Sequence, residues 1–381
     1  MSDPAATGAG LDPTLARAER MSRVRDAMRA RGVDVLLCSL GADLPWLSGY
    51  EAMPLERITM LVVPVDDEAT LVVPALEAPR VAHDGRLFAM RPWRETEDPI
   101  SIIDLLVGGR KRLAISDRAW AVHLLALKTQ LTGASWVAAS EVTSALRCVK
   151  DSAEIAALHA AGAAADRVAA ALLGGEIPLV GRTEASVSKE IGERLVAEGH
   201  HRVNFAIVGS GPNSASPHHE PGSRVIGPSE AVVCDFGGTY YLGDTVGYCS
   251  DITRTVFTGE PAPEFLELYG VLEEAQSRAV AAAVVGATCE SVDATGRDLI
   301  AAAGYGEAFI HRIGHGIGIE EHEDPYMVAG NLTRLESGHA FSVEPGIYLA
   351  GRFGARIEDI VVATEAGPVA CNSADHSLHI V

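Results

Sequence analysis

The sequence predicts a two-domain protein of the α/β (α+β) class, and three observations support this. The chain has 381 residues, enough for two domains that each bury a core. Strand-like and helix-like segments alternate over the first 145 residues, whereas beyond residue 150 the order helix, helix, strands occurs twice. We expect a disordered tail at residues 1–10, an N-terminal domain at 11–145 and a C-terminal domain at 146–381, with two similar halves facing a cleft.

Hydrophobic periodicity predicts the elements of the N-terminal domain. An amphipathic helix is expected at residues 14–31, where Leu15, Met21, Val24 and Met28 alternate with Arg and Glu. Strands are expected at 33–38, 58–65, 70–74 and 112–116, and further helices at 100–106 and 119–130. Such alternation is typical of a self-contained α/β domain.

Helix-capping signals mark the C-terminal domain. Asp151 and Glu154 have the spacing of a capping box, which predicts a helix up to Gly174. Thr183 is expected to cap a second helix that Gly199 ends. Two more helices are predicted at 263–285 and 291–303, and strands at 204–209, 231–238, 250–257, 339–348 and 355–363.

Composition narrows the classes of function. The formal net charge is −20, and so acidic a surface repels phosphate backbones, so no nucleic-acid partner is expected. The N-terminus lacks the pattern of a signal peptide, and no apolar run approaches the roughly 20 residues of a membrane span. The six cysteines form no C-x-x-C pair. We therefore expect buried, reduced thiols, a cytoplasmic location and no membrane partner.

The first pair of candidate functional residues is Asp235 and Asp251. Asp235 ends an apolar strand just before two glycines, and Asp251 opens the next strand. Alone, Asp235 is better explained as a turn residue. A hairpin of residues 231–238 and 250–257 would instead bring both carboxylates together, where they repel each other unless a proton or a metal lies between them.

A second pair, Glu344 and Glu358, lies downstream on apolar strands. A hairpin of residues 339–348 and 355–363 would bring these two carboxylates together as well. Arg356 shares a strand face with Glu358, whereas Asp359 points to the other face, so Glu358 is preferred to Asp359. Any one of these acids fits an ordinary surface charge, but four of them on apolar strands in two hairpins fit that explanation poorly.

His315 lies in a glycine-rich loop whose glycines are expected to let the backbone approach a bound group. A nucleotide loop is the rival idea, but no Lys-Ser/Thr follows and no Rossmann strand precedes. One imidazole with four carboxylates suits hard divalent metals such as Mn²⁺, with Co²⁺ or Zn²⁺ as alternatives. The set predicts two ions bridged by carboxylates, as in two-metal hydrolases. A further loop at 208–219 presents His218, and a simple surface turn explains it about equally well.

Five segments together resemble the pita-bread metallopeptidase family, which includes prolidase, aminopeptidase P and creatinase. They are Asp235-Phe-Gly-Gly, Ser250-Asp-Ile-Thr-Arg-Thr, Gly314-His-Gly-Ile-Gly, Val343-Glu-Pro-Gly-Ile-Tyr and Arg356-Ile-Glu-Asp. The resemblance covers most of 145–381 and extends more loosely over the first 145 residues. It implies a creatinase-type N-terminal α/β domain, a C-terminal pita-bread domain with pseudo-twofold halves, and a homodimer.

The resemblance also implies an activity, the hydrolysis of Xaa-Pro bonds at peptide N-termini, and a role for each matching residue. The implied metal ligands are Asp235, Asp251, His315, Glu344 and Glu358, with Asp251 and Glu358 bridging the ions. Glu344 would take up the proton of the attacking water, and His218 and His322 would contact the substrate. His311 and Tyr348 match flanking positions, and Arg356 matches a residue that holds the ligand carboxylates.

The chain departs from the family between its two aspartates, which are further apart here than is usual. The extra segment at 241–246 is interpreted as a longer hairpin tip, since loop extensions cost little. It contains Asp244, but Asp244 is offset from Asp251 by an odd number of residues and would face elsewhere. Asp235 is therefore kept as the first ligand.

Three questions about function stay open at this point. The sequence does not distinguish an Xaa-Pro dipeptidase from an Xaa-Pro aminopeptidase. A hydrolase of the same fold that acts on a small amide metabolite is an alternative, and so is a non-catalytic binding protein. The intact ligand set disfavours the last, because such relatives typically lose ligands.

Overall fold

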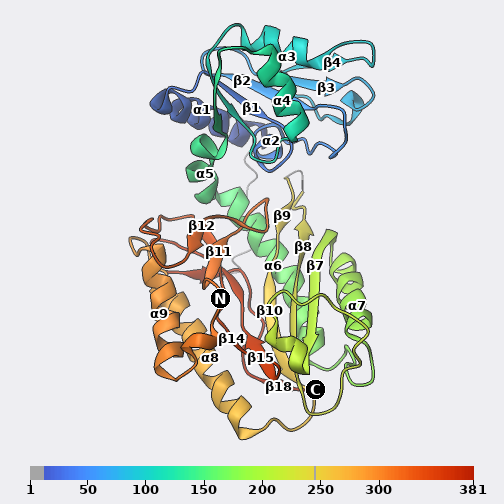
Figure 1. Ribbon diagram of the computed structural model, residues 1–381, viewed down its shortest axis with the longest axis vertical. Helices are drawn as coiled ribbons and strands as arrows, with labels where there is room; N and C mark the ends of the chain where they lie inside the picture. The colour runs from blue at the N-terminus through green and yellow to red at the C-terminus, as the bar shows by residue number, and fades with distance from the viewer. Residues whose placement is uncertain (1–12, 244–245) are drawn as a thin grey trace, which may run out of the picture. The chain divides into compact units, whose positions relative to one another are not determined.

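The computed structural model describes residues 13–243 and 246–381, which fall into two compact units (Figure 1). Among the described residues the first unit comprises the chain up to Arg147 together with Val246, and the second comprises the other residues from Cys148 onward. The expected tail at residues 1–10 lies outside the described residues, and so does Asp244. The mixed α/β class predicted from the sequence is confirmed, since both units combine sheets with helices.

The first unit is built on one mixed sheet of six strands in the order β4-β3-β2-β1-β5-β6. The strands are β1 (Val35–Cys38), β2 (Met60–Pro64), β3 (Thr70–Pro74), β4 (Ala89–Trp93), β5 (Arg112–Ile115) and β6 (Ser135–Ala138). The central strand β1 pairs antiparallel with β2 and parallel with β5. Because both faces of β1, β2 and β3 are buried, their sequences are continuous apolar runs.

The helices of the first unit are α1 (Pro13–Arg31), α2 (Asp43–Ser48), α3 (Pro99–Val107), α4 (Ala121–Gln130) and α5 (Ser140–Cys148). The predicted helices at 14–31, 100–106 and 119–130 are confirmed to within two residues. The elements missed from the sequence are α2, α5 and the two edge strands, β4 and β6. The edge strands are largely half-exposed, and β4 contains Arg91 and Pro92, so neither has the apolar run by which a buried strand is recognised.

The first half of the second unit packs two helices on one sheet. The helices are α6 (Ser152–Leu173) and α7 (Glu184–Ala197), and the sheet has the order β18-β10-β8-β7 with β9 beside β8. The strands are β7 (His200–Ser210), β8 (Ala231–Tyr240), β9 (Tyr248–Cys249), β10 (Ile252–Phe257) and β18 (His379–Ile380). Both predicted caps are confirmed, since Asp151 and Glu154 form a reciprocal capping box and Thr183 caps α7.

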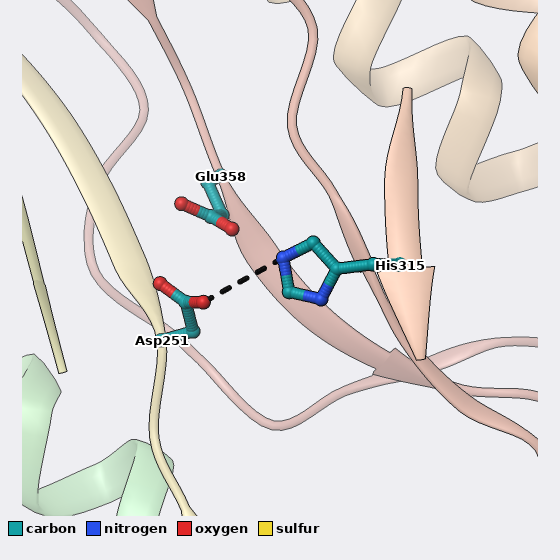
Figure 2. A group of neighbouring side chains, drawn as sticks. All are labelled: Asp251, His315 and Glu358. Atoms are coloured by element: carbon teal, nitrogen blue, oxygen red, sulfur yellow. Dashed lines mark ion pairs between the residues drawn. The ribbon is translucent and has the colours of Figure 1, made fainter. Parts of the chain in front are cut away.

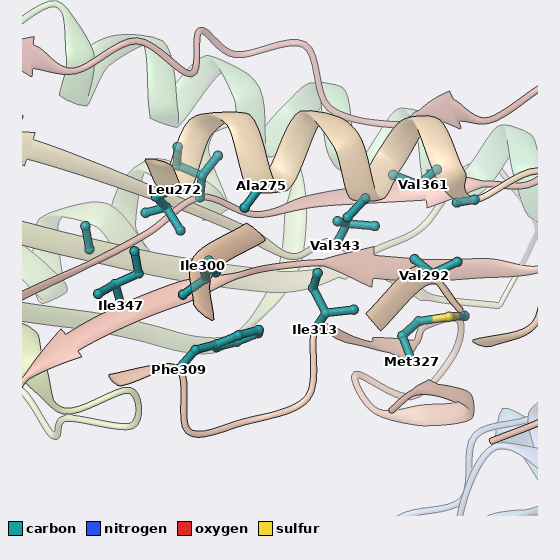
Figure 3. Packing of buried hydrophobic residues seen from close by; sticks show 14 of the residues in the cluster. Leu272, Ala275, Val292, Ile300, Phe309, Ile313, Met327, Val343, Ile347 and Val361 are labelled. Atoms are coloured by element: carbon teal, nitrogen blue, oxygen red, sulfur yellow. The ribbon is translucent and has the colours of Figure 1, made fainter. Parts of the chain in front are cut away.

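The second half repeats this arrangement with α8 (Pro263–Ala282) and α9 (Cys289–Ala302). Its main sheet has the order β12-β11-β13-β16-β17, and β14 and β15 form a separate pair. The strands are β11 (Gly314–Gly316), β12 (Glu323–Met327), β13 (Ala340–Val343), β14 (Gly346–Leu349), β15 (Phe353–Arg356), β16 (Asp359–Val362) and β17 (Val369–Ala370). Figure 3 shows the core of this half, where Leu272 and Ala275 of α8 pack near Val343 and Val361.

The expectation of continuous strands at 339–348 and 355–363 is wrong, because each strand is broken in its middle. Pro345 has no N–H for a ladder, and the chain changes partner there. Val343 lies opposite Asp359 in one sheet, and Gly346 lies opposite Arg356 in the other pair. Glu344 and Glu358 are therefore held at two breaks that face each other, rather than inside a regular ladder.

A long helix with few charged residues could cross a membrane when judged by length and composition alone. Within the described residues α6 meets that test, but 56% of its most apolar window is buried inside the fold. Ala165, Val168 and Leu172 pack in one cluster with residues of β8 and β10. Alanine-rich core helices reach such hydropathy without contact with lipid, so α6 is the buried core helix of this half.

Candidate metal centre

A cavity of about 760 Å³ in the second unit collects the predicted site residues. Nine of the lining residues were predicted from the sequence as site residues: four carboxylates, four histidines and one arginine. They are Asp235, Asp251, Glu344, Glu358, His218, His311, His315, His322 and Arg356. Tyr348 is not on the cavity wall, but its hydroxyl contacts both His311 and Arg356. Segments separated by more than a hundred residues thus meet at one place.

Asp251, His315 and Glu358 line the cavity and lie next to one another (Figure 2). Each offers a ligand atom, and these atoms all lie within 4.8 Å of one another. His315 Nδ1 is 3.1 Å from the Gly316 carbonyl oxygen, an acceptor, so Nδ1 carries the hydrogen and Nε2 of the neutral ring has a lone pair. Nε2 faces Asp251 Oδ2 at 3.8 Å and Glu344 Oε1 at 3.3 Å. The imidazole is thus presented as a ligand.

Asp235 enters the cavity from β8. The predicted hairpin is confirmed, because β8 and β10 pair antiparallel with Asp235 opposite Thr253. Arg356 Nη2 donates to Asp235 Oδ2 at 2.6 Å. Oδ1 of Asp235 and Oδ1 of Asp251 are buried without any hydrogen-bond partner. Buried carboxylate oxygens are rarely left in that state, and a cation at this position would satisfy both of them.

The glycines beside His315 allow close packing of strands, whereas the expected approach of a bound group to the backbone stays a prediction. A Cβ on Gly314 would collide with the backbone of Ser342 in β13, and one on Gly316 with the backbone of Asp324 in β12. The three strands therefore pack close enough to fix His315. The Ser342 hydroxyl accepts from His315 N at 3.0 Å and donates to Glu344 Oε1 at 3.1 Å, which ties two cavity residues together.

Burial and mutual repulsion shift the pKa values of the cavity groups. Burial, and then the charges of neighbouring carboxylates, raise the pKa of Asp251 and of Glu358 well above the usual range. Burial likewise raises the pKa of Glu344 to about 7, although Arg356 opposes this. Burial and then His322 lower the pKa of His315 to about 3. The imidazole is thus neutral at neutral pH, and the carboxyl groups hold protons that a metal would displace.

The described residues fit a divalent metal on three grounds. The donors are oxygen-rich with one imidazole, which suits hard divalent ions. Two buried carboxylate oxygens lack partners, and the grouped carboxylates need a compensating positive charge beyond that of Arg356.

Metal binding is expected to stabilise the protein more at pH 8 than at pH 5.5. The three raised carboxyl groups have unfolded pKa values near 4, so between about pH 4 and pH 7 the metal-free folded state holds more protons than the unfolded chain. Its unfolding free energy therefore falls as pH rises through this window, while metal affinity rises. Thermal unfolding of EDTA-stripped protein with and without Mn²⁺ measures the gain; equal gains at both pH values would contradict the prediction.

Thr253 is a functional residue that the sequence analysis placed on a strand face but did not select. Its buried hydroxyl donates to Glu358 Oε2 at 2.6 Å and accepts from Arg356 Nε at 3.0 Å. An isolated bridge between Thr253 and Glu358 also joins the two halves of the unit. Thr253 therefore orients one candidate ligand and the arginine that holds another. The sequence offered one signal for Thr253, its position two residues after Asp251 on the same face of the expected strand.

Replacing Thr253 with valine is expected to weaken metal affinity by about 10–100-fold, the usual cost of losing a residue that orients a ligand. Valine keeps the shape but removes the donor to Glu358 and the acceptor for Arg356. Titration with Mn²⁺ followed by isothermal calorimetry measures the change. Thr258→Val is the matched control, because Thr258 is equally buried but its hydroxyl contacts the backbone of Gly227 and Glu230. A Thr253 variant with the affinity of this control would refute the assignment.

A series of hydrogen bonds links His311, Tyr348 and Arg356 beside the cavity. His311 Nε2 lies 2.9 Å from the Tyr348 hydroxyl, and Arg356 Nη1 donates to that hydroxyl at 2.8 Å. Burial lowers the pKa of His311 to about 3 and raises that of Tyr348 to about 12, so both are neutral at neutral pH. Burial opposes the charge of Arg356, but neighbouring anionic groups raise its pKa well above the usual value. The Arg356 guanidinium group therefore keeps its positive charge at neutral pH.

His322 and His218 complete the polar wall. The His322 ring lies against that of His315, with centroids 3.9 Å apart. Burial, Arg312 and His218 lower the pKa of His322, which keeps it neutral. His218 comes from the segment that follows β7. The remaining wall residues were not predicted. Four of them are apolar, Phe205, Ile207, Pro217 and Ile310, and three are polar, Ser216, Arg312 and Glu321.

Asp359, the alternative that was set aside for Glu358, belongs to a separate cluster. Arg254 Nη2 donates to its Oδ1 at 2.7 Å, and His376 Nε2 lies 2.6 Å from its Oδ2. Gln276 contacts the same oxygen at 3.2 Å. Asp359 thus has a full set of partners and is not a residue of the cavity wall.

Comparison with known proteins finds a family match for each of the two units. Residues 156–365 match Metallopeptidase family M24, and residues 20–149 match the Creatinase/Prolidase N-terminal domain. The probable dipeptidase PepE of Mycobacterium tuberculosis is 43% identical over 368 residues, 96% of each chain. The Xaa-Pro dipeptidase of Lactobacillus helveticus is 37% identical and covers 91% of this chain and 95% of its own. The crystal structure of dipeptidase PepE from Mycobacterium ulcerans has a TM-score of 0.90 and 44% identity, over 98% of this chain and 100% of that one.

Proposed function

This chain belongs to metallopeptidase family M24, and on that premise we propose that it is an Xaa-Pro dipeptidase, which hydrolyses dipeptides at the bond before proline. The observation that carries the proposal is the convergence of Asp251, His315 and Glu358 with His218 and His322 in one cavity. Relatives over nearly the full length are named dipeptidase and Xaa-Pro dipeptidase, which supports the dipeptidase over the aminopeptidase.

The proposed cofactor is a pair of divalent ions, Mn²⁺ by preference because the donors are mostly carboxylates. The residues that would hold them are Asp235, Asp251, His315, Glu344 and Glu358. Ions bound there lower the pKa of water and polarise a carbonyl group.

The side chains around this centre have separate tasks in the proposed reaction. Glu344, whose carboxylate accepts a hydrogen bond from the Ser342 hydroxyl, takes up the proton of the attacking water. His322 and His218 donate hydrogen bonds to the oxygen of the scissile carbonyl as negative charge develops there. Arg356, held by Tyr348 and Thr253, keeps Asp235 in place.

Proline requires such a dedicated site. Its peptide bond has no N–H and its φ angle is fixed, so peptidases that grip an extended backbone cannot hold it. The apolar wall of Phe205, Ile207 and Ile310 offers a surface against which a pyrrolidine ring can pack without a hydrogen bond. The proposed site therefore combines apolar contact for the ring with polar groups for the carbonyl.

Two further properties are proposed, the location of the protein in the cell and its oligomeric state. A cytoplasmic location is proposed because the six cysteines are all buried, as is common for thiols of proteins in reducing compartments. A homodimer is proposed from the family resemblance, and size-exclusion chromatography with light scattering tests it.

Hydrolysis of Ala-Pro, Ala-Pro-Ala and Ala-Ala-Ala by Mn²⁺-loaded enzyme tests the function, each peptide with an EDTA control. Cleavage of Ala-Pro alone is the expected result. Cleavage of Ala-Pro-Ala would show that the enzyme is an aminopeptidase rather than a dipeptidase. Cleavage of all three peptides would show that it does not require proline. No cleavage of any peptide, with metal bound, would refute the peptidase and favour a hydrolase of small amides.

A further inference from the structure

A second buried carboxylate, Glu184, lies outside the metal cavity and is surrounded by hydrogen-bond donors. It stands in the first turn of α7 and is fully buried, with 0% of its surface exposed. Its Oε1 accepts from Ser210 N at 2.8 Å, Ser210 Oγ at 2.7 Å and Asn213 Nδ2 at 3.0 Å. Its Oε2 accepts from Asn213 Nδ2 at 3.1 Å and from His219 Nε2 at 2.8 Å.

The donors share one feature, since Ser210, Asn213 and His219 all belong to the segment 210–219 that follows β7. This segment carries His218 at the wall of the metal cavity. Glu184 therefore binds the segment at its start, in its middle and at the residue directly after His218. A buried carboxylate in a fully satisfied network fixes the conformation of the groups around it.

The other face of the segment is tied to the site itself. The Ser214 hydroxyl accepts from Gly354 N at 2.9 Å, and Arg356 Nη1 donates to the Pro217 carbonyl at 3.3 Å. The segment thus lies between Glu184 on one side and β15 with its Arg356 on the other. Motion of the backbone at residues 217–219 would move the His218 ring.

The site demands a carboxylate rather than an amide. Only a carboxylate accepts on both oxygens, and every contact of Glu184 above is with a donor. Although burial opposes its charge, hydrogen bonds from Ser210, His219 and Asn213 keep the pKa of Glu184 below its usual value, so it is ionised at neutral pH. Glutamine has nearly the same shape, but its NH₂ group would face at least one of these donors.

We propose that Glu184 is a positioning residue of the active site, whose carboxylate holds segment 210–219 and thereby sets the place of the His218 imidazole in the metal cavity. Glu184 itself touches no residue of the proposed metal set in the contacts described, so it acts only through the segment. The role in catalysis rests on the proposed function, whereas the hold on the segment does not.

The test compares Glu184→Gln with Glu193→Gln, a control on the same helix that removes an exposed carboxylate paired with Lys189. Hydrogen–deuterium exchange of the Mn²⁺-loaded protein is measured over residues 210–219. Exchange there is expected to accelerate about 10-fold or more in Glu184→Gln and to stay unchanged in the control. Unchanged exchange in Glu184→Gln would overturn the proposal. This readout needs no substrate, so it holds even if no peptide is cleaved and the proposed function fails.

A double-mutant cycle with His218→Ala tests whether Glu184 influences Ala-Pro hydrolysis through His218. Glu184→Gln alone is expected to lower kcat/KM by up to about 10²-fold, the cost of a misplaced catalytic group. In the His218→Ala background the same change is expected to cost less than about 2-fold, because the group it positions is absent. An additive loss would overturn the proposal, since a merely structural role acts equally in both backgrounds. If Glu184→Gln does not fold, His219→Leu removes a single donor and is measured in the same two ways.

Discussion

Replacing Asp251 with asparagine is expected to abolish metal loading and to lower turnover by at least about 10³-fold. Asp251 and Glu358 stand at the centre of the group of possible ligands, so the loss of one carboxylate removes a donor that no neighbour replaces. Metal chemistry at such a site stabilises the transition state by several kcal/mol, and about 4 kcal/mol corresponds to about 10³ in rate. Metal content by elemental analysis and Ala-Pro turnover measure the two effects.

The same variant separates ligation from folding. Burial and three neighbouring carboxylates raise the pKa of Asp251 well above its usual range, so without metal the group is a neutral acid, which asparagine imitates. Metal-free Asp251→Asn is therefore expected to unfold at a temperature no lower than the metal-free parent at pH 8, but to gain nothing from Mn²⁺. Asp298→Asn, at an exposed position of α9, is the control that should keep metal and turnover. Full Mn²⁺ loading of the Asp251 variant would refute its role as a ligand.

Replacing His322 with alanine is expected to lower turnover by about 10²–10⁴-fold, the range for loss of a group that transfers or holds a proton. Burial, Arg312 and His218 lower the pKa of His322, so the neutral ring is available as a hydrogen-bond donor at neutral pH. Its ring lies against His315 but His322 is not among the group of possible ligands, so metal content should stay near that of the parent. Single-turnover kinetics at saturating Ala-Pro measures the step directly.

The control for this experiment is His201→Ala, since His201 is an exposed histidine of β7 whose ring contacts Tyr241. That variant is expected to keep parental turnover. If His322→Ala lost metal in proportion to activity, the loss would be explained by ligation and the assigned role would be wrong. If it kept full turnover, His322 would only line the cavity.

Sequence reasoning located the acids and histidines of the cavity, and the resemblance added Arg356, but Thr253 and Glu184 were not selected. Asp235, Asp251, Glu344 and Glu358 were selected because ionisable residues on apolar strands are unusual, and that signal is local. Thr253 and Glu184 had a weaker signal, because a buried hydroxyl and a glutamate in the first turn of a helix occur in many sequences for other reasons. Their roles depend on partners that only folding brings near, such as Glu358 for Thr253, at a separation of 105 residues.

The sequence by itself determined the elements whose cause is local. The capping box at Asp151, the Thr183 cap and the continuous apolar runs of β1 to β3 follow from hydrogen bonds and burial patterns within a few residues. Short or half-exposed elements such as β4, β6 and α2 carry too weak a pattern to be recognised in this way.

Only the tertiary structure decided where the strands at 339–348 and 355–363 break, what the glycines around His315 do and which donors surround Glu184. Each of these is a property of contacts between segments far apart in the chain: Asp235 meets Arg356 across 121 residues, and Gly314 packs on the backbone of Ser342. Sequence periodicity describes which face of an element is buried, but not what it is buried against. The metal site therefore follows from the residues, and its geometry follows from the fold.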